Sequence, residues 1–399
     1  MRHAQTAANA ARKLQGHGQS SLTELGTGQA KALAARLDGA DYDLRVTSDL
    51  DRALQTAESL EGDFQASATW RELDVGAWEG RSWDEVRNEF GGDLERLRAG
   101  ANVALGGGET LEGFATRAGD AFEELAARLG SDGRALVVTH GGVINQILKA
   151  ICGLPVRSRR FGRSTNTSIT RLTRGRAGWT VSSFNDSLHL GVESPFLTER
   201  LGSGNRAAFL VRHGQTEANL SGRWQGASDQ GLNATGRMQA TALASRLSVD
   251  AVFSSPLQRA METAAVLDGR VSGPLEGLAE LRMGEWEDLT GEEIRARAPD
   301  AWRRIFVEGE DLPRGGTGET WEEVGMRFEE AVTTALSSPE AARIGLVSHG
   351  AAIGAYLCRV LEIPHPMRRR LSIVDNASVT TVVYGDQGGI IADFNVRPD

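Results

Sequence analysis

The chain repeats itself at about half its length. The string MRHAQTAAN at residues 1–9 returns as VRHGQTEAN at residues 211–219. Four further strings of the first half recur in the same order, 207 to 210 residues later. Five anchors in one order do not arise from composition, and a repeat changes how every other feature is interpreted. The sequence therefore predicts two copies of one domain.

The length of the chain agrees with two copies. A chain of 399 residues exceeds what one hydrophobic core usually holds and suits two domains of about 200 residues each. Residues 187–205 mix turn-forming residues and have no sustained helix or strand period. We expect a first domain at residues 1–190, a linker at 191–205 and a second domain at 206–399.

Each copy alternates short apolar runs with helical patterns, which is typical of an α/β fold. In the second copy, residues 207–212, 250–255 and 343–350 are apolar runs that fit buried strands. Ser255 is placed to cap the helix that follows, with Pro256 in its first turn. We expect two tandem three-layer α/β/α sandwich domains, each with a mainly parallel central sheet.

The first copy begins at Arg2 and His3, and no apolar run precedes them as one precedes Arg212. Its first strand therefore looks absent, and His3 would lie on a free terminus, where chains fray. Ala4 also stands where the second copy has Gly214, adding a methyl group where the backbone was expected to approach a bound group. We expect a true start upstream of Met1; a structurally weakened first copy is the alternative.

Charged side chains of the second copy follow predicted strands, at the edge where α/β sheets bind their ligands. Arg212 and His213 follow one strand, His349 follows another, and Arg259 lies early in the helix after a third. Guanidinium groups bind phosphate through bidentate hydrogen bonds and stay protonated. Neutral imidazole attacks phosphorus and can carry the phosphoryl group as a covalent intermediate. The pattern predicts phosphoryl chemistry with His213 as the nucleophile.

A leaving alkoxide needs a proton, so a carboxylic acid must stand near the phosphate. Glu280 is the expected donor, and Glu287, whose counterpart is Glu79, is the alternative; Glu285 has alanine in the matching place. We expect His349 to bind the equatorial oxygens and stabilise the moving charge. The alternative of a two-metal site needs clustered carboxylates, and the sequence has none near either histidine, so we expect no metal or other cofactor.

The strings VRHGQTEAN, SSPLQRAMETA, LAELRMGEWED and VSHGAA resemble the histidine phosphatase superfamily, also called the phosphoglycerate mutase-like family. The resemblance recurs once per copy and covers almost the whole chain. It implies that His213 is the phosphorylated residue and Glu280 the proton donor. The phosphate contacts that it implies in the second copy are Arg212, Arg259, His349, Asn219 and Gln225. The matching set in the first copy is Arg2, His3, Asn9, Gln15, Arg52, Glu72 and His140.

Two reactions fit this resemblance. A mutase must hold the phosphoryl group against water and benefits from a long covering insertion, whereas a phosphatase admits water. The acid and the second histidine are 68 residues apart in the first copy and 69 in the second, which is short for the mutase branch. We therefore expect a phosphatase for small phosphate monoesters; for the first copy, a non-catalytic phospho-ligand sensor or scaffold is an alternative.

Composition limits the partners. A net charge of −9 disfavours non-specific binding of nucleic acid. No stretch approaches the length of a membrane span, and the first residues leave no room for a secretory signal, so we expect a cytoplasmic protein. Cys152 and Cys358 are expected to be buried thiols, and Arg303, Arg304 and Arg314 to be solvated surface charges. The expected partner is a small phosphorylated substrate; the oligomeric state is left open.

Overall fold

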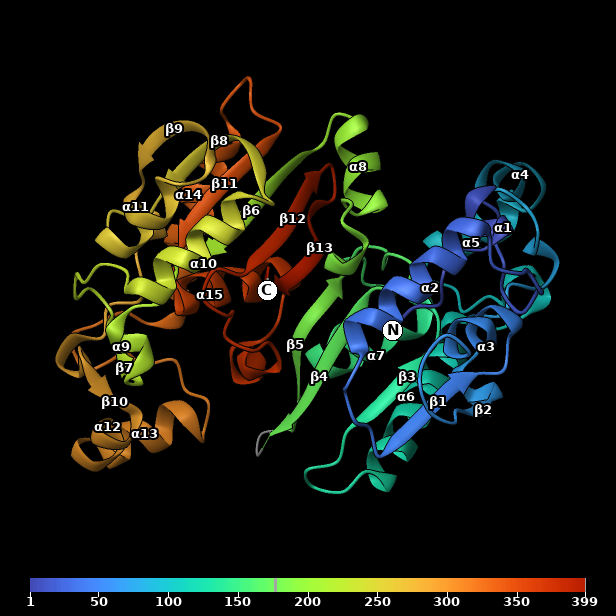
Figure 1. Cartoon of the computed structure of the whole chain (residues 1–399), viewed down its shortest axis with the longest axis horizontal. Helices are drawn as coiled ribbons and strands as arrows, with labels where there is room; N and C mark the ends of the chain where they lie inside the picture. The colour runs from blue at the N-terminus through green and yellow to red at the C-terminus, as the bar shows by residue number, and fades with distance from the viewer. Residues whose placement is uncertain (176–177, 399) are drawn as a thin grey trace. The chain divides into compact units, whose positions relative to one another are not determined.

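The computed structural model describes residues 1–175 and 178–398, which form two compact units (Figure 1). Unit 1 consists of Met1–Ser158, Arg163–Thr170 and Ser187–Ser194. Unit 2 consists of Arg159–Gly162, Arg171–Asp186 and Pro195–Asp399. The domain boundaries predicted from the repeat stay a prediction, because the compact units assign the end of the first repeat partly to unit 2.

Unit 1 is built on a parallel sheet with the strand order β2-β1-β3. The strands are β1 (Leu44–Ser48), β2 (Gln65–Ser67) and β3 (Ala135–Val138). Leu33 of α2 and Ala53 of α3 pack on one side of the sheet with Val138, and α6 and α7 pack against each other. The helices of unit 1 are α1 (Ala7–Ala10), α2 (Glu24–Leu37), α3 (Asp51–Ala57), α4 (Trp83–Glu89), α5 (Gly91–Arg98), α6 (Leu111–Arg128) and α7 (Gly141–Cys152).

Unit 2 contains an eight-stranded mixed sheet with the order β4-β5-β13-β12-β6-β11-β8-β9. The four neighbouring strands β6, β11, β8 and β9 are mutually parallel. On the other side of β6, β12 and β13 continue the sheet as antiparallel strands. The strands are β4 (Ile169–Gly175), β5 (Gly178–Asp186), β6 (Arg206–Arg212), β8 (Ser248–Ser254), β9 (Asp268–Pro274), β11 (Arg343–Ser348), β12 (Val379–Gly385) and β13 (Gly388–Val396). A short ribbon pairs β7 (Arg223–Trp224) with β10 (Leu289–Thr290).

Helices cover both faces of the unit 2 sheet, as the α/β/α prediction requires. Along β6, Phe209 and Val211 pack with Leu243 of α10 and Ala260 of α11, while α14 and α15 contact β6 as well. Alternate side chains of a strand point to opposite faces, so β6 is buried on both. The helices of unit 2 are α8 (Pro195–Gly202), α9 (Glu217–Leu220), α10 (Ala234–Ala244), α11 (Gln258–Ala264), α12 (Gly291–Arg297), α13 (Pro299–Phe306), α14 (Trp321–Leu336) and α15 (Gly350–Leu361).

The first residues of the chain are held firmly, contrary to the expectation of a fraying terminus. Arg2 forms a parallel bridge with Thr139 at the end of β3, and the Met1 ammonium donates to the Val137 carbonyl at 2.7 Å. Burial lowers the pKa of this amino group to about 5. The backbone N–H of His3 donates to the Thr139 carbonyl at 2.8 Å. Residues 1–3 therefore pair in parallel with the end of β3.

The segment expected to be a linker contains helix α8. Phe196 and Leu197 of α8 are buried in the core that includes Phe209 of β6. The sequence reading found only turn residues here because an eight-residue helix is too short to display a clear period. This helix is part of unit 2.

Equivalent residues of the two repeats meet inside unit 2. Phe184 of β5 pairs with Phe394 of β13, and these are the two phenylalanines that correspond in the repeat. Asn185 donates to the Ala392 carbonyl at 3.0 Å, and Asn395 donates reciprocally to the Ser182 carbonyl at 2.8 Å. The β5 strand of the first repeat thus extends the sheet of the second through a self-complementary edge.

In the part of the chain that the structure describes, no helix is long and apolar enough to cross a membrane. Cys152 and Cys358 are both buried, as predicted.

Candidate active site

The two histidines of each copy lie side by side at the carboxyl ends of parallel strands. His213 follows β6, and His349 follows β11 and precedes α15. Their ring centroids are 5.1 Å apart. In unit 1, His3 and His140 are also 5.1 Å apart. The convergence expected from the strand ends is therefore present in both copies.

The ring of His213 is held as a single tautomer. Its Nδ1 lies 2.6 Å from the Gly214 carbonyl, which can only accept, so Nδ1 carries the proton and Nε2 keeps its lone pair. Burial first, and then the charges of Arg212 and Arg259, keep the pKa of His213 well below its usual value. His3 has the same arrangement with the Ala4 carbonyl at 2.7 Å and a pKa lowered by burial. Both rings are thus neutral imidazoles near pH 7.

His349 sits between an arginine and a serine. Nε of Arg259 donates to Nδ1 of His349 at 3.2 Å, so Nε2 carries the proton and donates to the Ser255 hydroxyl at 2.8 Å. Burial, ahead of the nearby positive charges, lowers the pKa of His349 well below its usual value. In unit 1, His140 lies between Arg52 and Ser48 at 3.3 and 2.8 Å. Binding of the equatorial oxygens by the second histidine stays a prediction.

Ser255 does not cap the following helix as expected. Helix α11 begins at Gln258 with Leu257 at its N-cap and no side-chain cap. The Ser255 hydroxyl accepts from the backbone N–H of Leu257 at 3.2 Å, just before the helix, and from His349 at 2.8 Å. The local contact follows the preference of serine at the start of a helix, whereas His349 is 94 residues away in the chain.

Arg259 is fixed by the loop that follows α9. Its two terminal nitrogens donate to the carbonyls of Ser228 and Gly226 at 2.7 and 2.9 Å. Gly226 has φ +53, and a Cβ there would lie 2.3 Å from the Glu287 carboxylate, so glycine is required. Arg52 makes the same two contacts with Gly18 and Gly16, at 2.9 and 2.7 Å.

Glu287, the alternative proton donor, holds this loop. Its carboxylate accepts backbone N–H groups from Ala227 at 3.1 Å and Met283 at 2.8 Å. Glu79 accepts from His17 and Gly18 in the first copy. Glu287 and Glu79 thus hold the loops whose carbonyls accept from Arg259 and Arg52.

The carboxylate of Glu280, the preferred proton donor, contacts the first turn of α15. Its two oxygens accept from the backbone N–H groups of Ala352 at 3.0 Å and Ala351 at 3.3 Å. Glu72 accepts from Gly142 at the start of α7, also at 3.0 Å. Each carboxylate therefore stands beside the second histidine of its copy, which directly precedes that helix.

Four buried N–H groups in the two sites have no partner. They are Nε of Arg212 and Nε2 of Gln225 in the second copy, and Nε of Arg2 and Nε2 of Gln15 in the first. A buried donor left unsatisfied costs about 1–3 kcal/mol. The same atoms are unsatisfied at equivalent positions of both copies, so the cause is common to both sites.

Asn219 and Asn9 belong to the scaffold of the site. Asn219 forms a capping box with Thr216 at the start of α9 and accepts a hydrogen bond from Asn376 at 3.0 Å. Asn376 also donates to the carbonyl of His213, at 3.0 Å. Asn9 has the equivalent capping box with Thr6. Asn376 is 163 residues from His213 in the chain, so the bond between them was not predictable from the sequence.

Gly214 is explained by packing. A Cβ on Gly214 would lie 2.3 Å from the carbonyl oxygen of Gly236 in α10. The backbone N–H of Gly214 donates to the Thr263 hydroxyl at 3.1 Å, and Ala4 makes the same bond to Thr56 at 2.9 Å. Ala4 therefore keeps the backbone bond of its counterpart and is fully buried; that its methyl group lies near a bound group stays a prediction.

The expectation of a solvated Arg314 is wrong. Only 2% of Arg314 is exposed, and it contacts Asp311 at 3.4 Å. Arg303 and Arg304 lie on the surface, paired with Glu308 and Glu310. Arg314 is buried with the carboxylate of Asp311, three residues before it in the chain. This spacing permits an ion pair but does not predict one. Trp78 and Trp286 are both buried.

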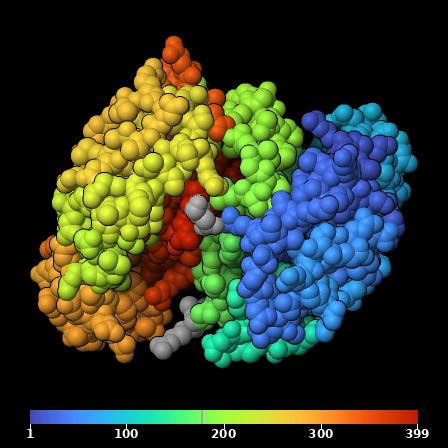
Figure 2. Space-filling model, in the orientation of Figure 1, coloured from blue at the N-terminus to red at the C-terminus, as the bar shows by residue number. Residues whose placement is uncertain are grey.

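Helices α12 and α13 form a small cap on β7. Trp302 of α13 stacks on Trp224 with centroids 6.0 Å apart, and Phe306 lies 4.4 Å from Trp302. In the space-filling view the orange segment of these helices lies directly against the yellow-green segment that carries β7 (Figure 2). The residue after Trp224 is Gln225, so the cap adjoins the site.

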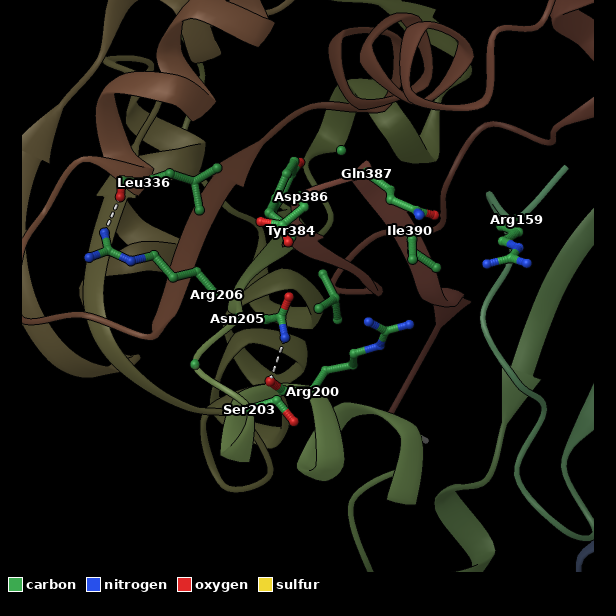
Figure 3. Close-up of a pocket in the computed structure, with 14 residues that line it drawn as sticks. Arg159, Arg200, Ser203, Asn205, Arg206, Leu336, Tyr384, Asp386, Gln387 and Ile390 are labelled. Atoms are coloured by element: carbon green, nitrogen blue, oxygen red, sulfur yellow. Dashed lines mark hydrogen bonds between the residues drawn. The ribbon is translucent and has the colours of Figure 1, made fainter. Parts of the chain in front are cut away.

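A cavity of about 670 Å³ in unit 2 lies away from these residues. It is lined by Arg200, Asn205 and Arg206 among others (Figure 3). Arg206 begins β6, whereas His213 follows its end. The cavity and His213 therefore lie at opposite ends of β6. Among residues 1–175 and 178–398, no three His, Cys, Asp or Glu side chains are grouped to hold a metal ion.

Comparison with known proteins agrees with the repeat. A sequence model of the histidine phosphatase superfamily (branch 1) matches residues 1–187 and again residues 208–397. Curated relatives named "Probable phosphoglycerate mutase GpmB" are 35% identical: that of Enterobacter sp. (strain 638) over 47% of this chain and 90% of its own length, and that of Proteus mirabilis over 44% and 84%.

Two solved structures are similar to about half of the chain. A mycobacterial glucosyl-3-phosphoglycerate phosphatase complexed with VO3 is 29% identical, with a TM-score of 0.42 over 48% of this chain and 99% of its own. A phosphoserine phosphatase mutant from Entamoeba histolytica, in complex with phosphoserine, is 29% identical, with a TM-score of 0.43 over 48% and 96%.

Proposed function

The chain belongs to the histidine phosphatase superfamily (branch 1), and from this premise we propose that it hydrolyses small phosphate monoesters through a phosphohistidine intermediate, without a metal ion. We propose one such site in each copy, around His213 and around His3.

The unsatisfied donors carry this proposal. Nε of Arg212 and Nε2 of Gln225 are buried without a partner, and the charge of Arg212 acts on the neutral ring of His213. A bound phosphate supplies oxygens that accept from such groups, and bonds to a charged group are about twice as strong as neutral ones. Arg259, held by two carbonyls, adds a second fixed positive charge.

In the first half-reaction, Nε2 of His213 attacks phosphorus. A P–N bond forms, the ester P–O bond breaks, and the leaving oxygen takes a proton from Glu280. The Gly214 carbonyl accepts from Nδ1 and so keeps the attacking lone pair on Nε2. Arg212 and Arg259 stabilise the charge on the transferred group.

In the second half-reaction, water takes the place of the alcohol. Glu280, now a carboxylate, accepts a proton from water as its oxygen attacks phosphorus. The P–N bond breaks, inorganic phosphate leaves, and His213 returns to its neutral form. One carboxyl group therefore acts as acid and then as base.

Phosphoryl transfer of the mutase type is the alternative. The curated relatives that match are named as phosphoglycerate mutases. We prefer hydrolysis because only 68 or 69 residues separate the acid from the second histidine, which leaves little chain to cover the intermediate.

The test is hydrolysis of an aryl phosphate, with excess chelator, by the wild type, His3→Ala, His213→Ala and the double variant. We expect both single variants to remain active and the double variant to be inactive. Full activity in the double variant would refute the phosphohistidine intermediate, and activity lost only in chelator would refute the metal-free mechanism. An inactive His213→Ala variant would make the first copy a binding domain.

A further inference from the structure

A cavity of about 540 Å³ opens beside Glu280 in unit 2. Glu280, the proton donor of the proposed reaction, is one of the residues that line this cavity, and a proton donor must reach the leaving oxygen. The cavity is therefore placed to receive the alcohol part of the substrate. This reasoning rests on the proposed function and concerns which alcohol the site accepts. The lining includes Ala227, Pro256, Leu257, Leu275, Ala279 and Glu280.

The wall of the cavity beside the acid is small and apolar. Pro256 and Leu257 precede α11, which carries Arg259. Ala227 lies between Gly226 and Ser228, whose carbonyls hold the same arginine. The apolar wall is therefore built from the segments that position the phosphate, and its distance from the reacting group is fixed.

The rim of the cavity is acidic. Glu319 pairs with Arg282 at 3.3 Å and with Arg327 at 2.9 Å. Glu276 and Glu330 also line the cavity, so carboxylates outnumber guanidinium groups there. A further negative charge on the alcohol would be repelled.

The first copy has polar side chains at three of these positions. His17, Asp49 and Arg71 stand where the second copy has Ala227, Pro256 and Ala279. Arg71 and Asp49 form a two-point ion pair at 2.7 and 2.6 Å. Nε2 of His17 donates to the carbonyl of Glu72, the acid of this copy, at 2.9 Å. The corresponding wall is therefore charged and hydrogen-bonding.

We propose that the two copies act on different phosphate monoesters. The second copy takes an uncharged alcohol with an apolar body, which buries against Ala227, Pro256 and Ala279. The first copy takes a small polar alcohol, which hydrogen-bonds to His17 and to the Arg71–Asp49 pair. An apolar group buried in such a pocket changes kcat/KM by roughly 10- to 200-fold per group of methylene size.

The test compares 1-naphthyl phosphate with glycerol 1-phosphate as a ratio of kcat/KM. His3→Ala reports the second copy alone, and His213→Ala reports the first. We expect the naphthyl-to-glycerol ratio to be at least about tenfold higher for the second copy. The ratio of the two kcat/KM values is taken for one variant, so an error in its protein concentration cancels. When the ratios of the two variants are compared, the difference in intrinsic reactivity between the two esters cancels as well.

Exchange of the wall residues tests the cause. In the His3→Ala background, the triple change Ala227→His, Pro256→Asp, Ala279→Arg should lower the ratio about tenfold. Ala279→Arg alone should lower it in the same direction, which covers failure of the triple variant to fold. Val271→Arg, at an exposed position of β9, adds the same charge outside the cavity lining and serves as the matched control.

The outcomes separate the two proposals. No hydrolysis by any single variant refutes the proposed function itself. Hydrolysis with equal ratios in both copies, or an Ala279→Arg ratio equal to that of Val271→Arg, overturns the difference in substrate while leaving the phosphatase proposal intact. If only the second copy is active, the proposal that both copies hydrolyse esters of different alcohols is overturned.

Discussion

The two phosphate sites have nearly the same internal geometry but different surroundings. The histidine rings are 5.1 Å apart in both, and each of Arg52 and Arg259 bonds to two loop carbonyls. Beside the acid, however, unit 1 places the Arg71–Asp49 ion pair and unit 2 places Pro256 and Ala279. The difference supports the proposal that the two copies share one chemistry and differ in the alcohol that they accept.

The largest effect is expected from the acid, and it should depend on the leaving group. Glu280→Gln in the His3→Ala background should lower kcat/KM, which reports the first half-reaction alone, about 10²- to 10⁴-fold on alkyl phosphates. A 4-nitrophenyl ester should lose far less, because its alcohol leaves without protonation. Glu72→Gln in the His213→Ala background is the matched variant for the first copy. Equal losses on both esters would remove Glu280 as the proton donor.

The second largest loss of activity is expected from substitution of the arginines. Arg259→Ala should lower kcat/KM about 10²- to 10³-fold, the usual loss when one preorganised donor to the developing charge is removed. Arg259→Lys should recover only part, since an ammonium cannot bond to the Ser228 and Gly226 carbonyls as the guanidinium does. Arg52 variants provide the comparison. Full recovery by lysine would mean that charge alone matters.

Much of this arrangement was predictable from sequence. Motif residues at strand ends predicted which side chains converge, because parallel strands finish at one edge of a sheet. Ser255 and Thr263 were missed as site residues, since their partners His349 and Gly214 lie far away in the chain. The assignment of Arg171–Asp186 to unit 2 was missed because an edge pairing leaves no local pattern.

Stability should fall with acid in both units. Burial holds the pKa values of the four site histidines well below 6.5, so below pH 6.5 the unfolded chain binds more protons than the folded one. Each histidine then removes up to about 1.4 kcal/mol per pH unit, and its contribution is fully present above pH 6.5.

Denaturant unfolding between pH 7.5 and 5 measures this slope. His349→Gln in unit 2 and His140→Gln in unit 1 should each lower the slope of the unfolding free energy against pH by the contribution of one histidine. A slope unchanged in both variants would mean that these rings are protonated in the folded protein.

The smallest expected effect concerns the residue after the nucleophile. Gly214→Ala should destabilise the protein by about 1–3 kcal/mol, because its Cβ would meet the Gly236 carbonyl at 2.3 Å. Ala4→Gly should cost about 1 kcal/mol, from the loss of one buried methyl group. Thermal or denaturant unfolding measures both. A neutral Gly214→Ala would show that α10 can move aside.

The pairing of Phe184 with Phe394 bears on how the chain can be dissected. From Ser158 to Pro195 the backbone passes several times between the two units before it remains in unit 2. A protease cut at residues 195–205 would leave β5 hydrogen-bonded to β13, so the fragments should stay together. A shortened chain that begins at residue 206 would lack β5. The edge of β13 would then be uncovered, which invites aggregation. The two halves are easier to tell apart by mutation than by cutting.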